Sequence, residues 1–202
     1  MDKTHWEKIY QTKPATQVSW FQEHAELSLQ FIRNTGAAKD GHIMDVGGGA
    51  STLVDDLLRE GYVNLTVLDI SVMALQAAQK RLGTAAGKVY WLEADITQIE
   101  LPEASVDVWH DRAVFHFLTD PLDRQRYVHA VLRSVKPGGH VIVATFAEDG
   151  PLHCSGLDVM HYRPETLHDE FGSAFKLTNS AEEMHHTPSG ADQHFIYCYC
   201  RR

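Results

Sequence analysis

The feature that most constrains the fold is a glycine-rich stretch, HIMDVGGGASTL, at residues 42–53. A short apolar run ends in Asp45, three consecutive glycines follow, and small hydroxyl residues lead into the apolar spacing of a helix. This order predicts a strand, a tight turn and a helix start. We expect a ligand at the turn, because glycines let the backbone approach it and the first helical turn has free N–H groups.

The rest of the chain alternates between predicted strands and helices. Glycine, Asp120-Pro121 and other capping signals separate these segments. We expect strands at about 42–46, 63–68, 88–92, 106–109 and 140–146, and helices at about 51–60, 71–83 and 121–135. Such alternation predicts an α/β fold, a Rossmann-like doubly wound sheet.

The two ends of the chain add further elements. Near the N-terminus, Ser19 and Gln22 form an expected capping box for a leading helix that ends near Gly36. Further along the chain, residues 136–139 form an expected sharp turn before the fifth strand. A helix at 164–171 and strands at 175–180 and 194–200 complete the prediction. The last strand is apolar on both faces, so we expect it to insert antiparallel between its neighbours, giving a seven-stranded, mostly parallel sheet.

We read the chain as a single domain over residues 1–202. Its parts are an N-terminal cap and helix at 1–36, a ligand-binding core at 37–146, and a loop with C-terminal strands at 147–202.

Composition excludes several classes of function. A formal net charge of -9 argues against broad nucleic-acid binding, and no apolar run is long enough to span a membrane. The polar N-terminus has no signal-peptide core, so cytoplasmic localisation is the default expectation. The three cysteines, Cys154, Cys198 and Cys200, fit neither a disulfide framework nor a zinc site, and no metal is expected.

Two classes of ligand suit a glycine turn after a first strand. The dinucleotide pattern requires a third glycine, but Thr52 stands there. Asp45, two residues before the turn, would repel a pyrophosphate. A carboxylate at that place suits a ligand with an ammonium and a sulfonium group, which describes S-adenosylmethionine.

Acidic residues also follow the next two predicted strands. Asp69 can accept hydrogen bonds from both ribose hydroxyls, and Asp95 can accept one from an adenine amino group. Ile70 and Ile96 can sandwich the adenine ring or belong to the core. The carboxyl ends of the strands are the edge where open α/β sheets bind ligands.

Five short motifs that could form the ligand site follow one another along the chain. They are DVGGGAS at 45–51, LDIS at 68–71, ADI at 94–96, VDVWHDR at 106–112 and LRSVKPGG at 132–139. In these segments the chain resembles the class I S-adenosylmethionine-dependent methyltransferases. It departs from them at Ser51, where a third glycine is common, and at Gly48, where cysteine is common; both replacements are small.

The resemblance implies a set of cofactor-binding residues and a set of substrate-binding candidates. The cofactor set is Asp45, Gly47, Gly48, Gly49, Asp69, Ile70, Asp95, Ile96 and Asp111. The N-terminal segments around Tyr10 and Trp20 look like the cap of small bacterial methyltransferases, and Arg112 is a candidate for binding an anionic substrate. The alternative for Arg112 is an ion pair with Asp111 or another nearby acid.

Candidate catalytic residues are His116, His153 and Asp111. His116 lies between two phenylalanines, where a histidine is more often packed than catalytic. His153 and Cys154 lie in a loop after the fifth strand and are also substrate-binding candidates. The alternative for this pair is a loop histidine and a buried thiol.

The expected reaction is methyl transfer to a small-molecule nucleophile by in-line displacement, with S-adenosylhomocysteine as product. Methylation of a protein lysine is the alternative. A non-catalytic cofactor-binding protein and an NAD-dependent oxidoreductase remain open as further classes. Nucleic-acid and membrane partners are not expected.

Overall fold

The computed structural model describes residues 2–202. The helices are α1 (Lys3–Thr12), η1 (Ala15–Gln17), α2 (Glu26–Asn34), α3 (Leu53–Arg59), α4 (Val72–Leu82), η2 (Gly83–Lys88), η3 (Phe115–Phe117), α5 (Pro121–Ser134) and α6 (Pro164–Phe171). The strands are β1 (Ile43–Val46), β2 (Leu65–Asp69), β3 (Val89–Glu93), β4 (Val106–Arg112), β5 (Val135–Phe146), β6 (His153–Cys154), β7 (Leu157–Asp158), β8 (Lys176–His186) and β9 (Asp192–Arg201).

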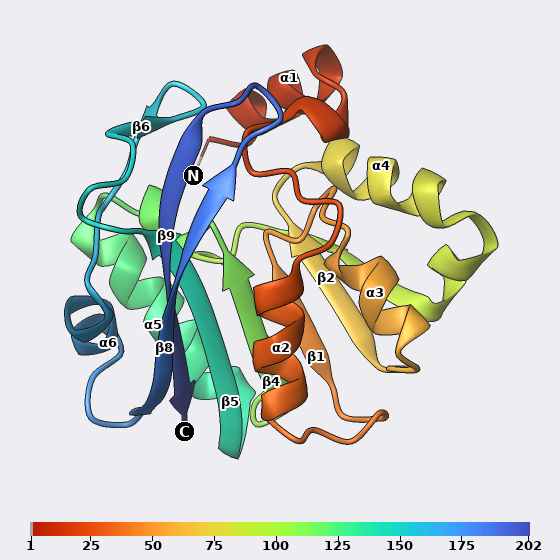
Figure 1. Ribbon diagram of the computed structural model, residues 1–202. Helices are drawn as coiled ribbons and strands as arrows, with labels where there is room; N and C mark the ends of the chain where they lie inside the picture. The colour runs from red at the N-terminus through yellow and green to blue at the C-terminus, as the bar shows by residue number, and fades with distance from the viewer. Residues whose placement is uncertain (1) are drawn as a thin grey trace.

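The centre of the structure is a seven-stranded sheet in the order β3-β2-β1-β4-β5-β9-β8 (Figure 1). The pairs from β3 to β5 are parallel, whereas β9 runs antiparallel to both β5 and β8. The predicted fold class is confirmed, including the insertion of the last strand between two neighbours. Strands β6 and β7 form a separate small hairpin.

Two apolar layers cover the sheet. Side chains of α2, α3 and α4 form one layer and those of α5 and α6 the other. In β9, Phe195 and Tyr197 pack on the first side and Ile196 and Cys198 on the second, as the alternation predicts. A strand buried on both faces belongs inside a sheet, which is the physical reason for the position of β9.

Local capping signals set several helix ends as predicted. The Ser71 hydroxyl accepts from the backbone N–H of Ala74 at 3.2 Å, and the Asp120 carboxylate accepts from that of Leu122 at 2.8 Å. Gly172 closes α6 with a φ of 71°. Each cap satisfies an N–H or carbonyl group that the helix leaves unpaired.

The predicted capping box at Ser19 is wrong. Helix α2 starts at Glu26, and residues 18–25 before it have no helical structure. Polar backbone groups of this segment form hydrogen bonds with distant residues instead. The Ser19 carbonyl pairs with His185 Nε2 at 2.7 Å, and the Gln22 carbonyl accepts from Thr52 Oγ1 at 2.9 Å. These long-range contacts override the local signal.

The strands of the C-terminal half are longer than predicted. Helix α5 passes directly into β5, and the expected turn at 136–139 bulges from the strand, because Val106 pairs with Val135 while Val108 pairs with His140. The β8–β9 hairpin likewise extends beyond its apolar segments. In residues 2–202, none of the helices has the length and apolar character to cross a membrane.

Candidate active site

Two adjoining cavities open at the carboxyl edge of the parallel strands. Counted together with the open solvent at their mouths, the empty space is about 550 Å³ in the first cavity and about 520 Å³ in the second. Trp20, Gly47 and Arg112 line both cavities and therefore mark their boundary. This is the edge at which open α/β sheets bind ligands, so the pair of cavities forms one elongated candidate site.

The glycine turn brings backbone close to two carboxylates. A Cβ on Gly48 would lie 2.3 Å from Asp45 Oδ2, and one on Gly49 would lie 2.3 Å from Asp69 Oδ2. Gly47 also has a φ of 67°, a conformation that favours glycine. Only glycine fits this turn while both carboxylates stay in place.

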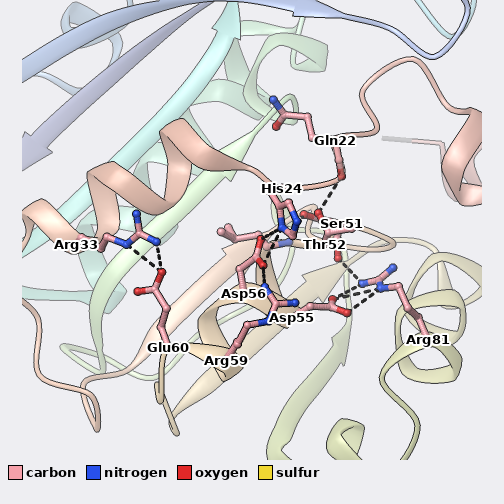
Figure 2. A network of polar contacts seen from close by, with 11 residues as sticks. Gln22, His24, Arg33, Ser51, Thr52, Asp55, Asp56, Arg59, Glu60 and Arg81 are labelled. Atoms are coloured by element: carbon pink, nitrogen blue, oxygen red, sulfur yellow. Dashed lines mark hydrogen bonds and ion pairs between the residues drawn. The ribbon is translucent and has the colours of Figure 1, made fainter.

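Helix α4 secures the segment after the turn. Arg81 donates to the carbonyl oxygens of Ala50 and Ser51 at 2.8 and 2.6 Å and pairs with Asp55 of α3 at 2.6 Å. Figure 2 shows this network and the bond from Thr52 to the Gln22 carbonyl. These bonds leave the loop little freedom to move, so the cavity wall is preformed.

Asp45 lies at the end of β1 and lines the second cavity. Its side chain is buried, and Oδ1 lies 2.7 Å from His110 Nδ1. The other oxygen, Oδ2, is buried with no hydrogen-bond partner among the described residues. A buried carboxylate oxygen without a donor is costly, so this atom fits a ligand that brings a donor.

Asp69 lies at the end of β2 and lines the first cavity. Burial raises its pKa to about 7, and the negative charges of Asp45 and Glu7 add to the shift. Its Oδ1 accepts from the backbone N–H of Ser71 at 2.8 Å. Hydroxyl donors from a ligand would stabilise the charged form and so offset the cost of burial.

The far wall of the first cavity is apolar. Ile70, Ala94 and Ile96 line it together with Leu68, as expected for a pocket that takes a flat ring. Asp95 does not line either cavity; its carboxylate accepts from the backbone and hydroxyl of Thr97 at 2.9 and 2.7 Å. An adenine contact of Asp95 stays a prediction.

Arg112 lies at the boundary of the two cavities, at the end of β4. Its guanidinium pairs with Glu183 at 3.1 Å and donates to the Tyr197 hydroxyl at 3.0 Å and to the Trp20 carbonyl at 3.1 Å. The alternative of an ion pair with a nearby acid is therefore present, with Glu183 rather than Asp111. The same side chain still forms part of the cavity wall.

Aromatic side chains close the first cavity from the N-terminal side. Trp6, Tyr10, Trp20 and Phe117 line it, with the rings of Trp6 and Phe117 4.9 Å apart. The pKa of Tyr10 is raised by burial and by the charge of Asp69, so its hydroxyl stays protonated at neutral pH. The wall thus combines apolar ring faces with the Tyr10 hydroxyl as a protonated polar group.

Helix α1 carries two of these aromatic residues and is fastened over the cavity. The Glu7 carboxylate accepts from the backbone N–H groups of Val72 and Met73 at 2.8 and 3.3 Å and from the Ser71 hydroxyl at 3.2 Å. These groups form the N-terminus of α4, where a negative charge is favourable. In Figure 1, α1 lies beside the start of α4.

The structure does not bring Asp111 to the cavities, where its predicted ligand contact or catalytic role would require it to lie. Asp111 is fully buried and lines neither cavity. Its carboxylate accepts from the backbone N–H groups of Val114 and Phe115 at 2.8 and 3.1 Å and from the Tyr127 hydroxyl at 2.6 Å. Neighbouring residues on a strand point to opposite faces, so Asp111 turns away from the site that Arg112 lines.

The structure does not bring His116, the candidate general base, to the cavities either. The ring is fully buried, packs against Phe117 and Phe146, and lines neither cavity. Burial lowers its pKa to about 3, with the charge of Arg112 contributing. A base needs access to the reacting proton and a pKa near the working pH, and His116 has neither.

The loop candidates His153 and Cys154 lie outside both cavities. His153 is exposed and pairs with Asp158 across the β6–β7 hairpin at 2.9 Å. Cys154 is buried, and burial raises the pKa of its thiol to about 11, so it is unreactive at neutral pH. Both follow the alternatives of a loop histidine and a buried thiol.

Sequence reasoning missed His110 and Phe117 as cavity-lining residues. His110 lines the second cavity and Phe117 the first. His110 and Asp111 are consecutive on β4, and successive side chains of a strand point to opposite faces of the sheet. This alternation alone could have shown that only one of the two faces the site. Among residues 2–202, the structure contains no group of three or more side chains suited to hold a metal ion.

Comparison with known proteins agrees with this geometry. Residues 43–139, a little under half of the chain, match a family described as "Methyltransferase domain". The eEF1A lysine and N-terminal methyltransferase of Mus musculus is 27% identical over 150 residues, covering 71% of this chain and 21% of that protein. The ubiquinone biosynthesis O-methyltransferase of Alkalilimnicola ehrlichii is 33% identical over 120 residues, covering 59% and 47% respectively.

A solved structure shares the fold over nearly the whole chain. It is the 1,6-didemethyltoxoflavin-N1-methyltransferase of Burkholderia thailandensis, determined with bound 1,6-didemethyltoxoflavin and S-adenosylhomocysteine. The TM-score is 0.75 at 16% identity, covering 99% of this chain and 86% of the other. The present chain spans only part of the curated relatives it matches: 21% of the mouse protein and 47% of the bacterial one.

The sheet with its flanking helices has the Rossmann-like fold of a methyltransferase, and the paired cavities lie at the carboxyl edge of its parallel strands. Residues 43–139 match the methyltransferase domain, and this match together with the shared fold supports a class I S-adenosylmethionine-dependent methyltransferase. The described residues fit the cofactor of this class: Asp45 Oδ2 lacks a donor, and the glycine turn has no room for a Cβ beside either carboxylate. The predicted family and cofactor are confirmed.

Proposed function

We propose that the chain transfers the methyl group of S-adenosylmethionine to a small-molecule nucleophile. The observation that carries the proposal is the shared boundary of the two cavities at Trp20, Gly47 and Arg112. The first cavity supplies Asp69, Ile70 and apolar surface for a nucleoside, and the second supplies Asp45 for a cationic group. The reacting centre then belongs at the boundary between them.

The cofactor supplies a methyl group on a sulfonium, which is already a good leaving group. The chain's own residues contribute placement: Asp69 and the apolar wall hold one end of the site, and Asp45 holds the other. The rings of Trp6, Trp20 and Phe117 line the first cavity and exclude water from it. Holding two reactants in line can supply a large part of the barrier reduction, about 7–11 kcal/mol.

The cavity walls offer little help with proton transfer. Among the described residues that line them, the titratable ones are Tyr10, Asp45, Asp69, His110 and Arg112. Tyr10 is protonated, both ring nitrogens of His110 are in hydrogen bonds, and the two carboxylates serve the cofactor. We therefore expect an acceptor that attacks without a protein base, such as a neutral amine or a thiolate.

Methylation of a protein lysine is the second candidate, favoured by the mouse relative. A surface groove continues from the second cavity past Phe21 and Gln22, which line both. Glu23 gives this groove a negative side chain that could attract a basic peptide, whereas Glu183 in the same groove is paired with Arg112. The aromatic wall is more consistent with a small flat acceptor, and we rank that reading first.

A radiolabelled methyl-transfer assay separates these readings. The protein is incubated with cell lysate and methyl-labelled S-adenosylmethionine, and the products are fractionated into small molecules, protein and nucleic acid. Label in the small-molecule fraction supports the proposal, whereas label in protein supports the second candidate. Label in neither, from a protein that binds S-adenosylhomocysteine, contradicts both and indicates a non-catalytic binder. Asp69→Ala, whose cofactor binding should be weaker, is the comparison variant and should transfer less label at low cofactor concentration.

A further inference from the structure

Asp45 and His110 are direct neighbours across the β1–β4 pair. The parallel register places them opposite each other, and both side chains are nearly fully buried, at 5% exposure for Asp45 and 3% for His110. Asp45 Oδ1 lies 2.7 Å from His110 Nδ1. An ionised carboxylate has no proton to donate, so Nδ1 carries the hydrogen.

The other side of the imidazole is fixed as well. His110 Nε2 lies 2.9 Å from the Ser28 hydroxyl on α2, and Ser28 Oγ lies 3.4 Å from the Tyr197 hydroxyl on β9. With both ring nitrogens bonded, the ring cannot rotate without breaking a buried hydrogen bond. Asp45 Oδ1 is therefore held in one position.

The arrangement Asp45–His110–Ser28 has the geometry of a nucleophilic triad but not its exposure. Ser28 is fully buried and lines neither cavity. A nucleophile must reach its substrate, so the serine serves as a fixed hydrogen-bond partner. The one member of the group with a polar atom left for a ligand is Asp45, whose buried Oδ2 has no partner among the described residues.

We propose that His110 is a positioning residue that holds Asp45 so that its free Oδ2 receives the ammonium group of the cofactor's amino-acid end. This inference rests on the proposed function, since it needs S-adenosylmethionine in the paired cavities. His110 acts by consuming Oδ1 and leaving Oδ2 for the ligand. Without it the carboxylate can rotate, and its interaction with the ammonium group loses strength.

The test measures binding by calorimetry with two probes. S-adenosylhomocysteine carries the amino-acid end, whereas 5′-methylthioadenosine has the same nucleoside and thioether without it. In His110→Gln, whose amide reaches toward Ser28, we expect affinity for S-adenosylhomocysteine to fall about tenfold or more. We expect affinity for methylthioadenosine to stay within about twofold, because the nucleoside contacts are unchanged.

The conservative variant His110→Asn places an amide donor where Nδ1 stands. We expect it to restore most of the affinity for S-adenosylhomocysteine, which a purely structural role would not predict. His42→Gln is the matched control. His42 is also bonded at both nitrogens, to the Ser105 carbonyl at 2.9 Å and Thr66 Oγ1 at 2.8 Å, but it lies at the opposite edge of the sheet.

Equal losses for the two probes in His110→Gln would overturn the inference, because they would indicate general damage to the fold. Unchanged affinity for both would overturn it as well. A wild-type protein that binds neither probe would instead overturn the proposed function, and this inference with it. Thermal melts of each variant show whether a loss comes from unfolding.

Discussion

The carboxylate of Asp69 occupies the space that a side chain at Gly49 would need. A Cβ there would lie 2.3 Å from Asp69 Oδ2 and 2.9 Å from the Cβ of Ala74. The glycine turn and the strand-end carboxylate therefore depend on each other. This relationship makes the turn a wall of the first cavity as well as a connection between β1 and α3.

Gly49→Ala should lower the free energy of unfolding by about 1–3 kcal/mol, the usual cost of inserting a methyl group into a filled space. It should also weaken binding of S-adenosylhomocysteine, because Asp69 must move. Urea unfolding and calorimetry measure the two effects. Gly87→Ala is the control, since a Cβ there would meet nothing within 4 Å. Equal stability of the two variants would contradict the packing argument.

Asp69→Ala should weaken binding of S-adenosylhomocysteine by about 1–3 kcal/mol, the range for removing hydrogen bonds to a charged group. Calorimetry on the folded variant measures the change. Asp169→Ala removes an exposed carboxylate from α6 and should leave the affinity as it is. If Asp69→Ala binds as tightly as wild type, Asp69 does not contact the cofactor.

Breaking the Arg112–Glu183 pair should be strongly destabilising, because each single change leaves a charge without its partner on a side chain that is only 8% or 16% exposed. Arg112→Met and Glu183→Gln should each cost about 3–5 kcal/mol, and the double variant less than their sum. A double-mutant cycle by urea unfolding measures the coupling. The exposed pair Arg163–Glu148 is the control, expected to couple by less than about 1 kcal/mol. Additive losses at Arg112 and Glu183 would show that the two side chains act independently.

His116 should make the protein less stable in acid. Its pKa is about 3 in the folded state against 6.5 for the free side chain, so the folded state binds fewer protons between these values. Stability is therefore lost as the pH falls below about 6.5, by about 2 kcal/mol at pH 5.

His116→Asn keeps an acceptor for the Phe146 N–H and removes the titration, so its loss between pH 7.5 and pH 5 should be smaller than that of wild type. Urea unfolding at the two pH values provides the comparison. His129→Gln, at an exposed position, should behave as wild type. The same pH dependence in wild type and His116→Asn would refute the assignment.

Glu7→Gln should loosen α1 over the first cavity. The loss of the negative charge at the N-terminus of α4 costs about 0.3–1 kcal/mol and weakens the bonds to Val72 and Met73. Hydrogen exchange should become faster in α1 while the central strands keep their protection. The exposed Glu103→Gln is the control. Unchanged exchange in α1 would show that aromatic packing alone holds the helix.

The α/β alternation, the doubly wound class of the sheet and the place of β9 were predictable from local patterns. Periodicity and capping residues act over a few positions, so Ser71, Asp120 and Gly172 could be identified without a structure. Where a segment is held by distant partners, the local signal failed. Ser19 forms no cap because its carbonyl pairs with His185, far along the chain.

The candidate site also contains some residues that the sequence predicted correctly and others whose position only the structure revealed. Asp45, Asp69 and the glycines are adjacent to strand ends in the sequence, and the structure places them at one edge. Asp111 and His116 carry suitable chemistry, but the pleat of β4 and the packing around η3 turn them into the core. No spacing rule within one segment reveals which buried groups will surround such a side chain.

The sequence by itself determined the class of fold, the ligand-binding turn and the acidic residues beside it, because each follows from neighbouring positions on one strand, turn or helix. Only the tertiary structure decided that His110 rather than Asp111 serves the site, that Glu183 neutralises Arg112, and that α1 closes the cavity. Those outcomes depend on the register between β1 and β4 and on contacts between segments far apart in the chain. Their energies arise from burial and pairing in three dimensions.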